Sequence, residues 1–490
     1  MKTFRNSVRA GLVLVVCVVS FAAFGLNSST MASGVWGLAT RAEFADGVLG
    51  ESPEDRFESV SCASAGDCTA VGRFKNVDGN FEALTMTSTD GVWGQATPAV
   101  FADGVQGESP DDRFESVSCA SAGYCTAVGY FKNVDGNFEA LTMTSTDGVW
   151  GQGTPVVFAE AQNEYPDSIF NSVSCGSVGN CTAVGRFKNV GGGYEAFTMT
   201  STDGVWGQGT PALFADGVQL DSPNSEFRSV SCASAGNCTA VGRFRNVGDR
   251  DEAFTMTSTN GVWGQATPAL FADGVQHDKP DAEFRSVSCA SAGNCTAVGF
   301  FWNVDRYLAF TMTSTDGVWG QGIPALFADG VRNESSEEQF NSVSCGSVGN
   351  CYAVGFFVDV NWNYVAFTMT STDGVWGQAT PVVFAEAQNE YPNSSSYSVS
   401  CGSVGNCTAV GVFKNVGGGY EAFTMMSTYT PPAETTTTVA ATTTTVAATT
   451  TTVAAALLPA TGSDSNGWLV AAMCAVITGT VLITRRRRIN

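Results

Sequence analysis

Polar and apolar residues alternate in short segments over most of this chain. In one segment Leu84 and Met86 alternate with Thr85 and Thr87, which is the period of a strand with one buried face. The pattern predicts four short strands in this part of the chain, at residues 58–62, 69–74, 83–88 and 92–98. Turn residues separate the strands, and no helical period accompanies them.

The same unit recurs along the chain. Its first cysteine returns every 56 or 57 residues, at Cys62, Cys119, Cys175, Cys232, Cys289, Cys345 and Cys401. A tryptophan keeps the same spacing, from Trp36 to Trp376. Four strands in each of seven copies predict an all-β fold, a seven-bladed β-propeller of four-stranded blades. An open stack of β units is the alternative.

The two ends of the repeat region are complementary. The chain enters at residues 34–37, which correspond to a fourth strand, and leaves after residues 424–427, which correspond to a third strand. Pairing the N-terminal strand with the last copy would close the ring and leave no exposed sheet edge. Closure by the N-terminal strand is therefore expected.

Fourteen of the 16 cysteines form pairs with five residues between the partners. The predicted disulfides are Cys62–Cys68, Cys119–Cys125, Cys175–Cys181, Cys232–Cys238, Cys289–Cys295, Cys345–Cys351 and Cys401–Cys407. The remaining two, Cys17 and Cys474, lie in segments that we expect to be removed. Zinc is the alternative, but the spacing is not that of a metal knuckle and no histidine accompanies it. One disulfide per blade indicates an exported protein.

Charge and composition narrow the function. The net charge is −22, so the surface repels phosphate backbones and nucleic acid is excluded as a partner. The single histidine, His277, lies in an acidic loop and is expected to be solvated. No nucleophile elbow, phosphate loop, metal cluster or dense calcium loop is recognisable, so we predict no catalytic residue, metal or cofactor.

Both ends of the chain carry processing signals. Residues 1–32 have a basic start and an apolar run, which indicates a secretory signal peptide; an uncleaved membrane anchor is the alternative. Residues 431–457 are rich in Thr and Ala and too poor in large apolar residues to build a core, so they predict a disordered stalk. The repeats between these segments, residues 33–430, form the expected propeller domain.

The last segment, residues 458–490, contains Leu458, Pro459, Ala460, Thr461 and Gly462, then an apolar stretch at 468–484 expected to be a helix, and four arginines. This arrangement resembles the LPxTG sorting signal of Gram-positive surface proteins. The resemblance implies that a sortase cleaves after Thr461 and joins the chain to peptidoglycan. The apolar helix would hold the chain in the membrane only before sorting. A plain tail-anchored membrane protein is the alternative.

The turn before each fourth strand has a recurrent sequence, Ser-Thr-Asp-Gly-Val-Trp at residues 88–93. It resembles the Asp-box of sialidase-type propellers, although it is shorter by two residues. The resemblance implies a structural role, in which the Asp90 carboxylate accepts backbone N–H bonds while Trp93 packs between blades. Sialidases also need an arginine triad and a Tyr/Glu pair, whereas Arg73, Arg186 and Arg243 repeat at one blade position and indicate a strand-edge feature.

A binding face is easier to predict than a catalytic site. Propeller topology brings the fourth-to-first and second-to-third connections to one face, and the former are acidic and variable. Copies five and six add aromatic residues there, namely Phe301, Trp302, Tyr307, Phe357, Trp362 and Tyr364. Aromatic platforms suit sugar rings or a partner protein. The predicted ligand-binding residues are Trp302, Tyr307, Trp362 and Tyr364; the alternative is that the aromatics cover their own blades.

Together these patterns predict a secreted, monomeric, non-enzymatic binding or adhesion protein on the wall of a Gram-positive cell. A degenerate surface glycosidase and a purely structural wall component are the alternatives. Sortase and peptidoglycan are the expected partners, together with a carbohydrate or protein ligand.

Overall fold

The structure is a computed structural model that describes residues 35–428 with the exception of 37, 45–53, 159–162, 164, 166, 216, 219–223, 272–280, 304–305, 329–336, 386–388, 390 and 392. The predicted signal peptide, the stalk, the sorting signal with its apolar helix and His277 lie outside the described residues. Within the described residues, no helix has the length and apolarity needed to cross a membrane. All described residues belong to one compact unit, Met1–Ala433.

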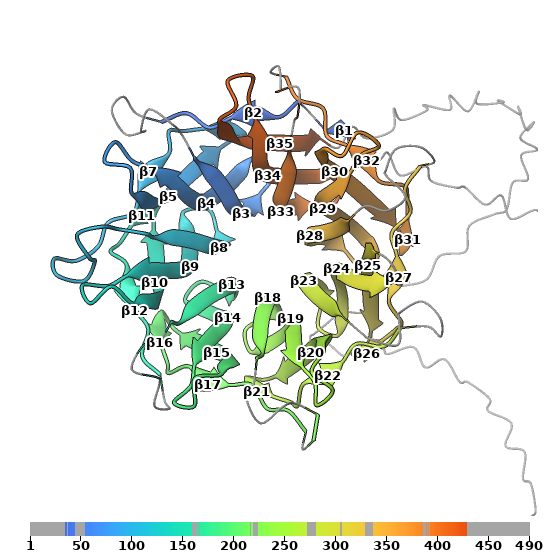
Figure 1. The fold of residues 1–490 in the computed structure, drawn as a ribbon, viewed down its shortest axis with the longest axis horizontal. Coiled ribbons are helices and arrows are strands. Elements are labelled where there is room, and N and C mark those ends of the chain that lie inside the picture. Colours follow the sequence, from blue (N-terminus) through green and yellow to red (C-terminus); the bar gives the residue numbers. More distant parts are fainter. Residues whose placement is uncertain are drawn as a thin grey trace, which may run out of the picture. The chain divides into compact units, whose positions relative to one another are not determined.

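The described strands form seven sheets arranged in a ring, which confirms the predicted seven-bladed β-propeller (Figure 1). The first complete blade contains β3 (Arg56–Ser64), β4 (Asp67–Lys75) and β5 (Phe81–Thr89) in antiparallel order. Its fourth strand is divided into β6 (Val92–Trp93) and β7 (Thr97–Pro98), which both pair with β5. The first strand of each blade lies nearest the centre of the ring.

The next five blades repeat this order. The second blade has β8 (Arg113–Ser121), β9 (Tyr124–Lys132), β10 (Phe138–Thr146), β11 (Val149–Trp150) and β12 (Thr154–Pro155). The third has β13 (Ile169–Ser177), β14 (Asn180–Lys188), β15 (Tyr194–Thr202), β16 (Val205–Trp206) and β17 (Thr210–Pro211). The fourth has β18 (Glu226–Ser234), β19 (Asn237–Arg245), β20 (Asp251–Thr259), β21 (Val262–Trp263) and β22 (Thr267–Pro268).

The fifth blade has β23 (Ala282–Ser291), β24 (Asn294–Asn303), β25 (Arg306–Thr315), β26 (Val318–Trp319) and β27 (Ile323–Pro324). The sixth has β28 (Glu338–Ser347), β29 (Asn350–Val358), β30 (Tyr364–Thr372), β31 (Val375–Trp376) and β32 (Thr380–Pro381). The seventh blade has β33 (Ser395–Ser403), β34 (Asn406–Lys414) and β35 (Tyr420–Thr428).

The seventh blade takes its outer strand from the start of the chain, as the sequence predicted. Strand β1 (Val35–Trp36) pairs with β35 through Val35–Thr428 and Trp36–Ser427. Strand β2 (Thr40–Arg41) continues the pairing further along β35. The ring is therefore closed by hydrogen bonds between the two ends of the repeat region.

A circle of serine hydrogen bonds joins each blade to the next near the axis. Ser59 Oγ accepts the Val117 N–H at 3.2 Å, and Ser398 Oγ accepts the Val60 N–H at 3.2 Å across the closure. The same bond occurs at all seven junctions between described strands. Each bond satisfies a buried donor that the innermost strand would otherwise leave unpaired.

The hydrophobic core lies between the blades rather than within them. One cluster combines Phe57 and Phe74 of the first blade with Val410 and Ala422 of the seventh, and Trp93 packs against it. The tryptophans of the next five blades pack in the same way. Burial of these faces is the main stabilising term, because each sheet is apolar on both sides.

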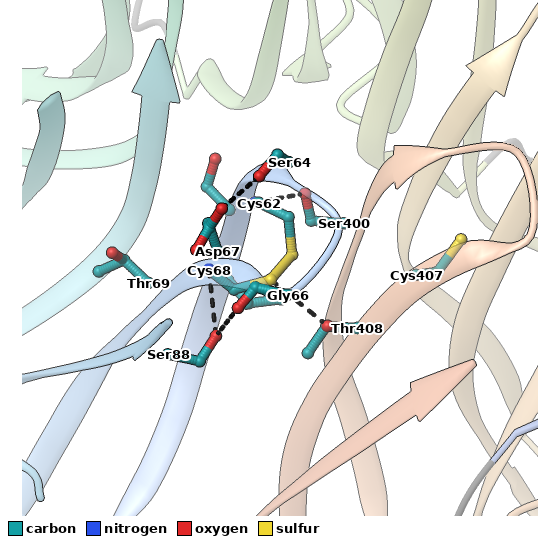
Figure 2. The surroundings of a disulfide bond; sticks show 12 residues. Cys62, Ser64, Gly66, Asp67, Cys68, Thr69, Ser88, Ser400, Cys407 and Thr408 are labelled. Atoms are coloured by element: carbon teal, nitrogen blue, oxygen red, sulfur yellow. Dashed lines mark hydrogen bonds between the residues drawn. A yellow bond between two sulfur atoms is a disulfide. The ribbon is translucent and has the colours of Figure 1, made fainter. Parts of the chain in front are cut away.

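The predicted disulfides are formed in all seven blades. Each joins the first and second strands at their hairpin, and Figure 2 shows Cys62–Cys68. The Cys68 N–H donates to Ser88 Oγ at 3.1 Å, and Ser88 in turn donates to the Gly66 carbonyl at 2.7 Å. Ser88 thus ties the third strand to the disulfide hairpin.

The aspartate of the recurrent turn has a different role from the one that the resemblance implied. Asp90 and Gly91 have φ angles of 51° and 81°, as a two-residue hairpin turn between right-twisted strands requires. The Asp90 N–H donates to Asp67 Oδ1 at 3.2 Å, and the Gly91 N–H donates to the Gly66 carbonyl. The turn is therefore held by backbone conformation and by the neighbouring hairpin.

Candidate functional site

A cavity of about 340 Å³ opens where the sixth, seventh and first blades meet. Its walls include Asp55, Arg56 and Arg73 of the first blade, Tyr364 of the sixth and Tyr420 of the seventh. These residues lie where first and third strands begin and second strands end, on the side of the blade-to-blade connections. The volume lies at the lower end of the range of about 300–1,000 Å³ that is typical of ligand pockets.

The cavity exists because the seventh blade departs from the repeat. By strand register, Ser395 and Ser396 occupy the positions of Arg56 and Phe57, while Val412 occupies that of Arg73. The other six blades have a fully buried phenylalanine where Ser396 stands, at Phe57, Phe114, Phe170, Phe227, Phe284 and Phe340. The small side chains at the start of β33 leave room that phenylalanine fills in every other blade and that Arg or Glu fills beside it in four of them.

Ion pairs occupy the corresponding space in other blades. Glu226 of the fourth blade is buried among Arg186, Arg228 and Arg243, at 3.2, 2.7 and 2.9 Å. Burial alone would raise the pKa of Glu226, but the three arginines outweigh burial and lower it. Arg186 and Arg243 are thus committed to structural pairs, in agreement with the strand-edge interpretation.

Asp55 is the most unusual residue of the cavity. It is 4% exposed, and its Oδ2 accepts the Ala422 N–H of the seventh blade at 3.4 Å. Its Oδ1 is buried and has no hydrogen-bond partner among the described residues. Burial raises the pKa of Asp55 to about 6, partly offset by the Ala422 N–H.

Other blades make the same backbone contact without a spare oxygen. Ser168, Ser225 and Ser394 each accept the equivalent alanine N–H through a hydroxyl, at 3.0–3.1 Å. Asp112 is the equivalent carboxylate in the second blade, and its two oxygens accept hydrogen bonds from Gln106 and the Lys132 N–H. Of the two aspartates at this position, Asp55 alone keeps a carboxylate oxygen without a hydrogen-bond partner among the described residues.

Two arginines lie beside Asp55 in the cavity. Arg56 is paired with Glu58, with Nε 2.5 Å from Oε1. The Arg73 guanidinium lies 4.1 Å from the centre of the Phe81 ring, and its Nε is buried without a hydrogen-bond partner among the described residues. Burial and the charges of Arg56 and Arg113 lower the pKa of Arg73 from its ordinary value. Arg73 therefore offers an unused donor.

Aromatic side chains form the more open part of the wall. Tyr364 and Tyr420 are 43% and 40% exposed. Tyr364 packs edge-on against Phe356, with ring centres 5.2 Å apart, and Tyr397 contributes a further ring. The cavity therefore combines apolar ring faces with one carboxylate and one guanidinium that have hydrogen-bonding capacity to spare.

The structure brings only one of the four predicted aromatic residues to this cavity. Tyr364 lines it, whereas Trp302 and Tyr307 pack against each other at 4.9 Å at the tip of the β24–β25 hairpin. The Tyr307 hydroxyl donates a hydrogen bond to the Asp281 carboxylate at 2.6 Å, so its proton is already used within the fifth blade. Trp362 is 67% exposed and has a φ angle of 66° in its turn.

Two aromatic residues that the sequence assigned to the same face belong to the core instead. Phe301 and Phe357 are buried, in the clusters that join the fourth blade to the fifth and the fifth to the sixth. Strand alternation explains this correction, because both occupy the position of the buried Phe74. The prediction counted aromatic residues without assigning each to a face of its strand.

Sequence reasoning also missed Asp55, Arg56, Arg73, Tyr397 and Tyr420. A usable signal was present, because residues 394–397 read Ser-Ser-Ser-Tyr where most other copies have a charged residue and a phenylalanine. A buried position that departs from the repeat gives up favourable packing, and such positions are expected at functional sites.

Comparisons with known proteins give no family for this chain. No protein-family model matches it, and no curated protein matches it. Similar solved structures include a protein of unknown function from Dyadobacter fermentans, at 10% identity and a TM-score of 0.47, covering 81% of this chain and 100% of that one. An ulvan lyase of polysaccharide lyase family PL25 matches at 10% identity and a TM-score of 0.47, over 79% and 95% of the two chains. The neuraminidase-like N11 protein of a flat-faced bat influenza virus from Peru matches at 10% identity and 0.38, over 82% and 95%. At this identity none of them assigns an activity to the chain.

Proposed function

We propose that this chain is a secreted, non-enzymatic binding protein, displayed on the wall of a Gram-positive cell, whose ligand site is the cavity between the sixth, seventh and first blades. The observation that carries the proposal is the combination of an interrupted repeat with unsatisfied polar groups. Ser395 and Ser396 open the space, and Asp55 leaves a buried oxygen facing no protein donor among the described residues. Such a group lowers stability unless a ligand uses it.

Binding is favoured over catalysis by how the carboxylates are held. Glu54 pairs with Lys75 at 3.0 Å, and Asp55 is tied to the backbone of Ala422. A glycosidase needs two carboxylates free to act on opposite sides of one bond. Among the described residues, no group of three or more His, Cys, Asp or Glu side chains is arranged to hold a metal ion.

Display outside the cell is supported by two independent features. One disulfide in every blade suits an oxidising compartment. The pentapeptide at residues 458–462, with its apolar stretch and arginines, supports covalent attachment through Thr461. In a Gram-positive host that has a sortase, Thr461→Ala should move the protein from the wall fraction to the membrane fraction and the medium. Retention of the variant in the wall fraction would contradict the anchoring.

The binding function is tested with the isolated propeller, residues 33–430, because its ring is closed by its own strands β1 and β2. Screening it against glycan and protein arrays should give specific binding that Tyr364→Ala abolishes. Tyr194 is the matched control, since it begins the third strand of the third blade and lies outside the cavity. Blank arrays, or equal loss in Tyr194→Ala, would favour the structural alternative, and turnover of chromogenic glycosides would favour the glycosidase.

A further inference from the structure

The charges lining the cavity cancel, which restricts the ligand. Glu54, Asp55, Arg56 and Arg73 are its charged wall residues, two of each sign. Arg56 is neutralised by Glu58 and Glu54 by Lys75. Three buried atoms of these residues have no hydrogen-bond partner among the described residues, namely Asp55 Oδ1, Arg56 Nε and Arg73 Nε. Because Arg56 Nε is ion-paired with Glu58, the acceptor left for a ligand is Asp55 Oδ1 and the donor is Arg73 Nε. An anionic ligand would face Asp55, and a cationic ligand would face Arg73.

A hydroxyl group is the ligand function that matches such a pair. It donates one hydrogen bond and accepts others, so neighbouring hydroxyls satisfy a carboxylate and a guanidinium together without adding charge. The rings of Tyr364 and Tyr420 add apolar faces of the kind on which the C–H face of a sugar packs. The net charge of −22 on the whole chain also disfavours acidic glycans at low ionic strength.

We infer that the cavity binds a neutral sugar ring, with one hydroxyl donating to Asp55 Oδ1, a second accepting from Arg73, and the ring face packed on Tyr364. This inference rests on the proposed function and narrows its ligand from carbohydrate or protein to uncharged carbohydrate. It also gives the unsatisfied oxygen of Asp55 a partner and accounts for the small residues at the start of β33.

The decisive variant is Asp55→Ser. Serine stands at this position in the third, fourth and seventh blades and makes the same hydrogen bond to the backbone of the neighbouring blade. The substitution therefore keeps the Ala422 contact and removes the spare carboxylate oxygen together with the negative charge. Asp112→Ser makes the same substitution in the second blade, away from the cavity, where both carboxylate oxygens already have protein partners, and serves as the control.

The experiment measures binding of the propeller, residues 33–430, to arrays of neutral hexose oligosaccharides, of matched uronate-containing oligosaccharides and of unglycosylated proteins. We expect binding to neutral glycans, with affinity reduced about tenfold or more in Asp55→Ser and unchanged in Asp112→Ser. A simple hexose that competes in solution then identifies the ring.

The pH dependence separates neutral from acidic ligands by its sign. Burial raises the pKa of Asp55 to about 6, so the carboxylate is ionised above this pH. Affinity for a neutral sugar should fall severalfold between pH 7.5 and pH 5, whereas affinity for a uronate would rise as the like charge disappears. The charged and titratable groups around Asp55 are Arg41, Glu54, Arg56, Arg73, Lys75, Tyr364, Tyr397, Tyr420 and Glu421.

The outcomes distinguish this inference from the proposed function. Binding restricted to uronates or to proteins, or glycan binding that Asp55→Ser leaves intact, would overturn the inference and leave a binding protein. Blank arrays for the wild-type propeller would overturn both. The same loss in Asp112→Ser as in Asp55→Ser would show that the effect is structural and would also overturn the inference.

Discussion

Asp55→Ser should stabilise the propeller near neutral pH although it removes a hydrogen-bonding group. The pKa of Asp55 is raised from 3.8 to about 6 by burial, so the folded state holds its proton more tightly than the unfolded chain. The contribution of protonated Asp55 to stability is fully present below pH 3.8, its pKa in the unfolded chain. It is lost as the pH rises through about 6, its pKa in the folded state. Above pH 7 Asp55 is ionised in both states, and a pKa raised by about two units then destabilises the folded state by about 3 kcal/mol.

Serine avoids this cost because it carries no charge, and it retains the bond to the Ala422 N–H as Ser394 does for Ala366. The unfolding entropy of a body of roughly 400 residues is about 0.8 kcal/mol per kelvin, so the melting temperature should rise by about 3–4 °C at pH 8. Well below pH 4 the gain should vanish, since Asp55 is then protonated in both the folded and the unfolded state.

Differential scanning calorimetry of both proteins at pH 8 and below pH 4, with the disulfides intact, measures the effect. The reverse change, Ser168→Asp, places a carboxylate at the equivalent buried position of the third blade and should lower the melting temperature by a similar amount at pH 8 only. A melting temperature that Asp55→Ser leaves unchanged at pH 8, or raises equally at both pH values, would refute the reasoning.

Three further substitutions test the packing. Replacing Cys62 and Cys68 together by serine should lower the free energy of unfolding by about 2 kcal/mol, because the disulfide closes a small loop; an unchanged denaturation midpoint would contradict this. Gly72→Ala should lower the free energy of unfolding by about 3 kcal/mol or prevent folding, because a Cβ there would lie 2.1 Å from the Arg56 carbonyl oxygen. A normal yield of folded protein and an unchanged circular-dichroism melt would count against that contact. Ser396→Ala should raise stability by about 1 kcal/mol, since the buried Ser396 hydroxyl has no hydrogen-bond partner among the described residues; a lower denaturation midpoint would reveal a partner for it.

Most of the fold could be predicted because each copy repeats the same local signals. Alternation around Leu84 and Met86 gave the strands, and the spacing of the cysteines gave the blades and the disulfides. The offset between the two ends of the repeat region gave closure by β1, which is confirmed. The outer strand was predicted as one segment, but it forms two, because the Ala96 N–H between β6 and β7 donates to the Glu43 carbonyl instead of to β5.

The candidate site was harder to predict because it depends on small side chains at positions where other copies have large ones. It also depends on contacts between distant parts of the chain. Asp55 meets Ala422 across 367 positions in sequence, and the space beside it exists only because Ser395 and Ser396 are small. Aromatic residues such as Trp302 were conspicuous by type, but the face of the sheet that each side chain occupies follows from strand register. Register and burial together separated Tyr364, which lines the cavity, from Phe357, which is core.

The closure by β1 and β2 has a consequence for how such a gene can change. The seal joins a fourth-strand segment before the first copy to a third strand in the last copy, so its two halves stay matched whichever complete copies lie between them. Unequal recombination between the near-identical units would add or delete whole blades and still deliver both halves of the seal. Such an event does not by itself preserve the junction between the seventh and first blades. Ser395 and Ser396 occur in one copy only, and aspartate stands at the position of Asp55 only in the first and second blades. Selection on recombinants would therefore act on the junction that holds the cavity. The number of blades would be limited separately, by the angle at which neighbouring sheets pack.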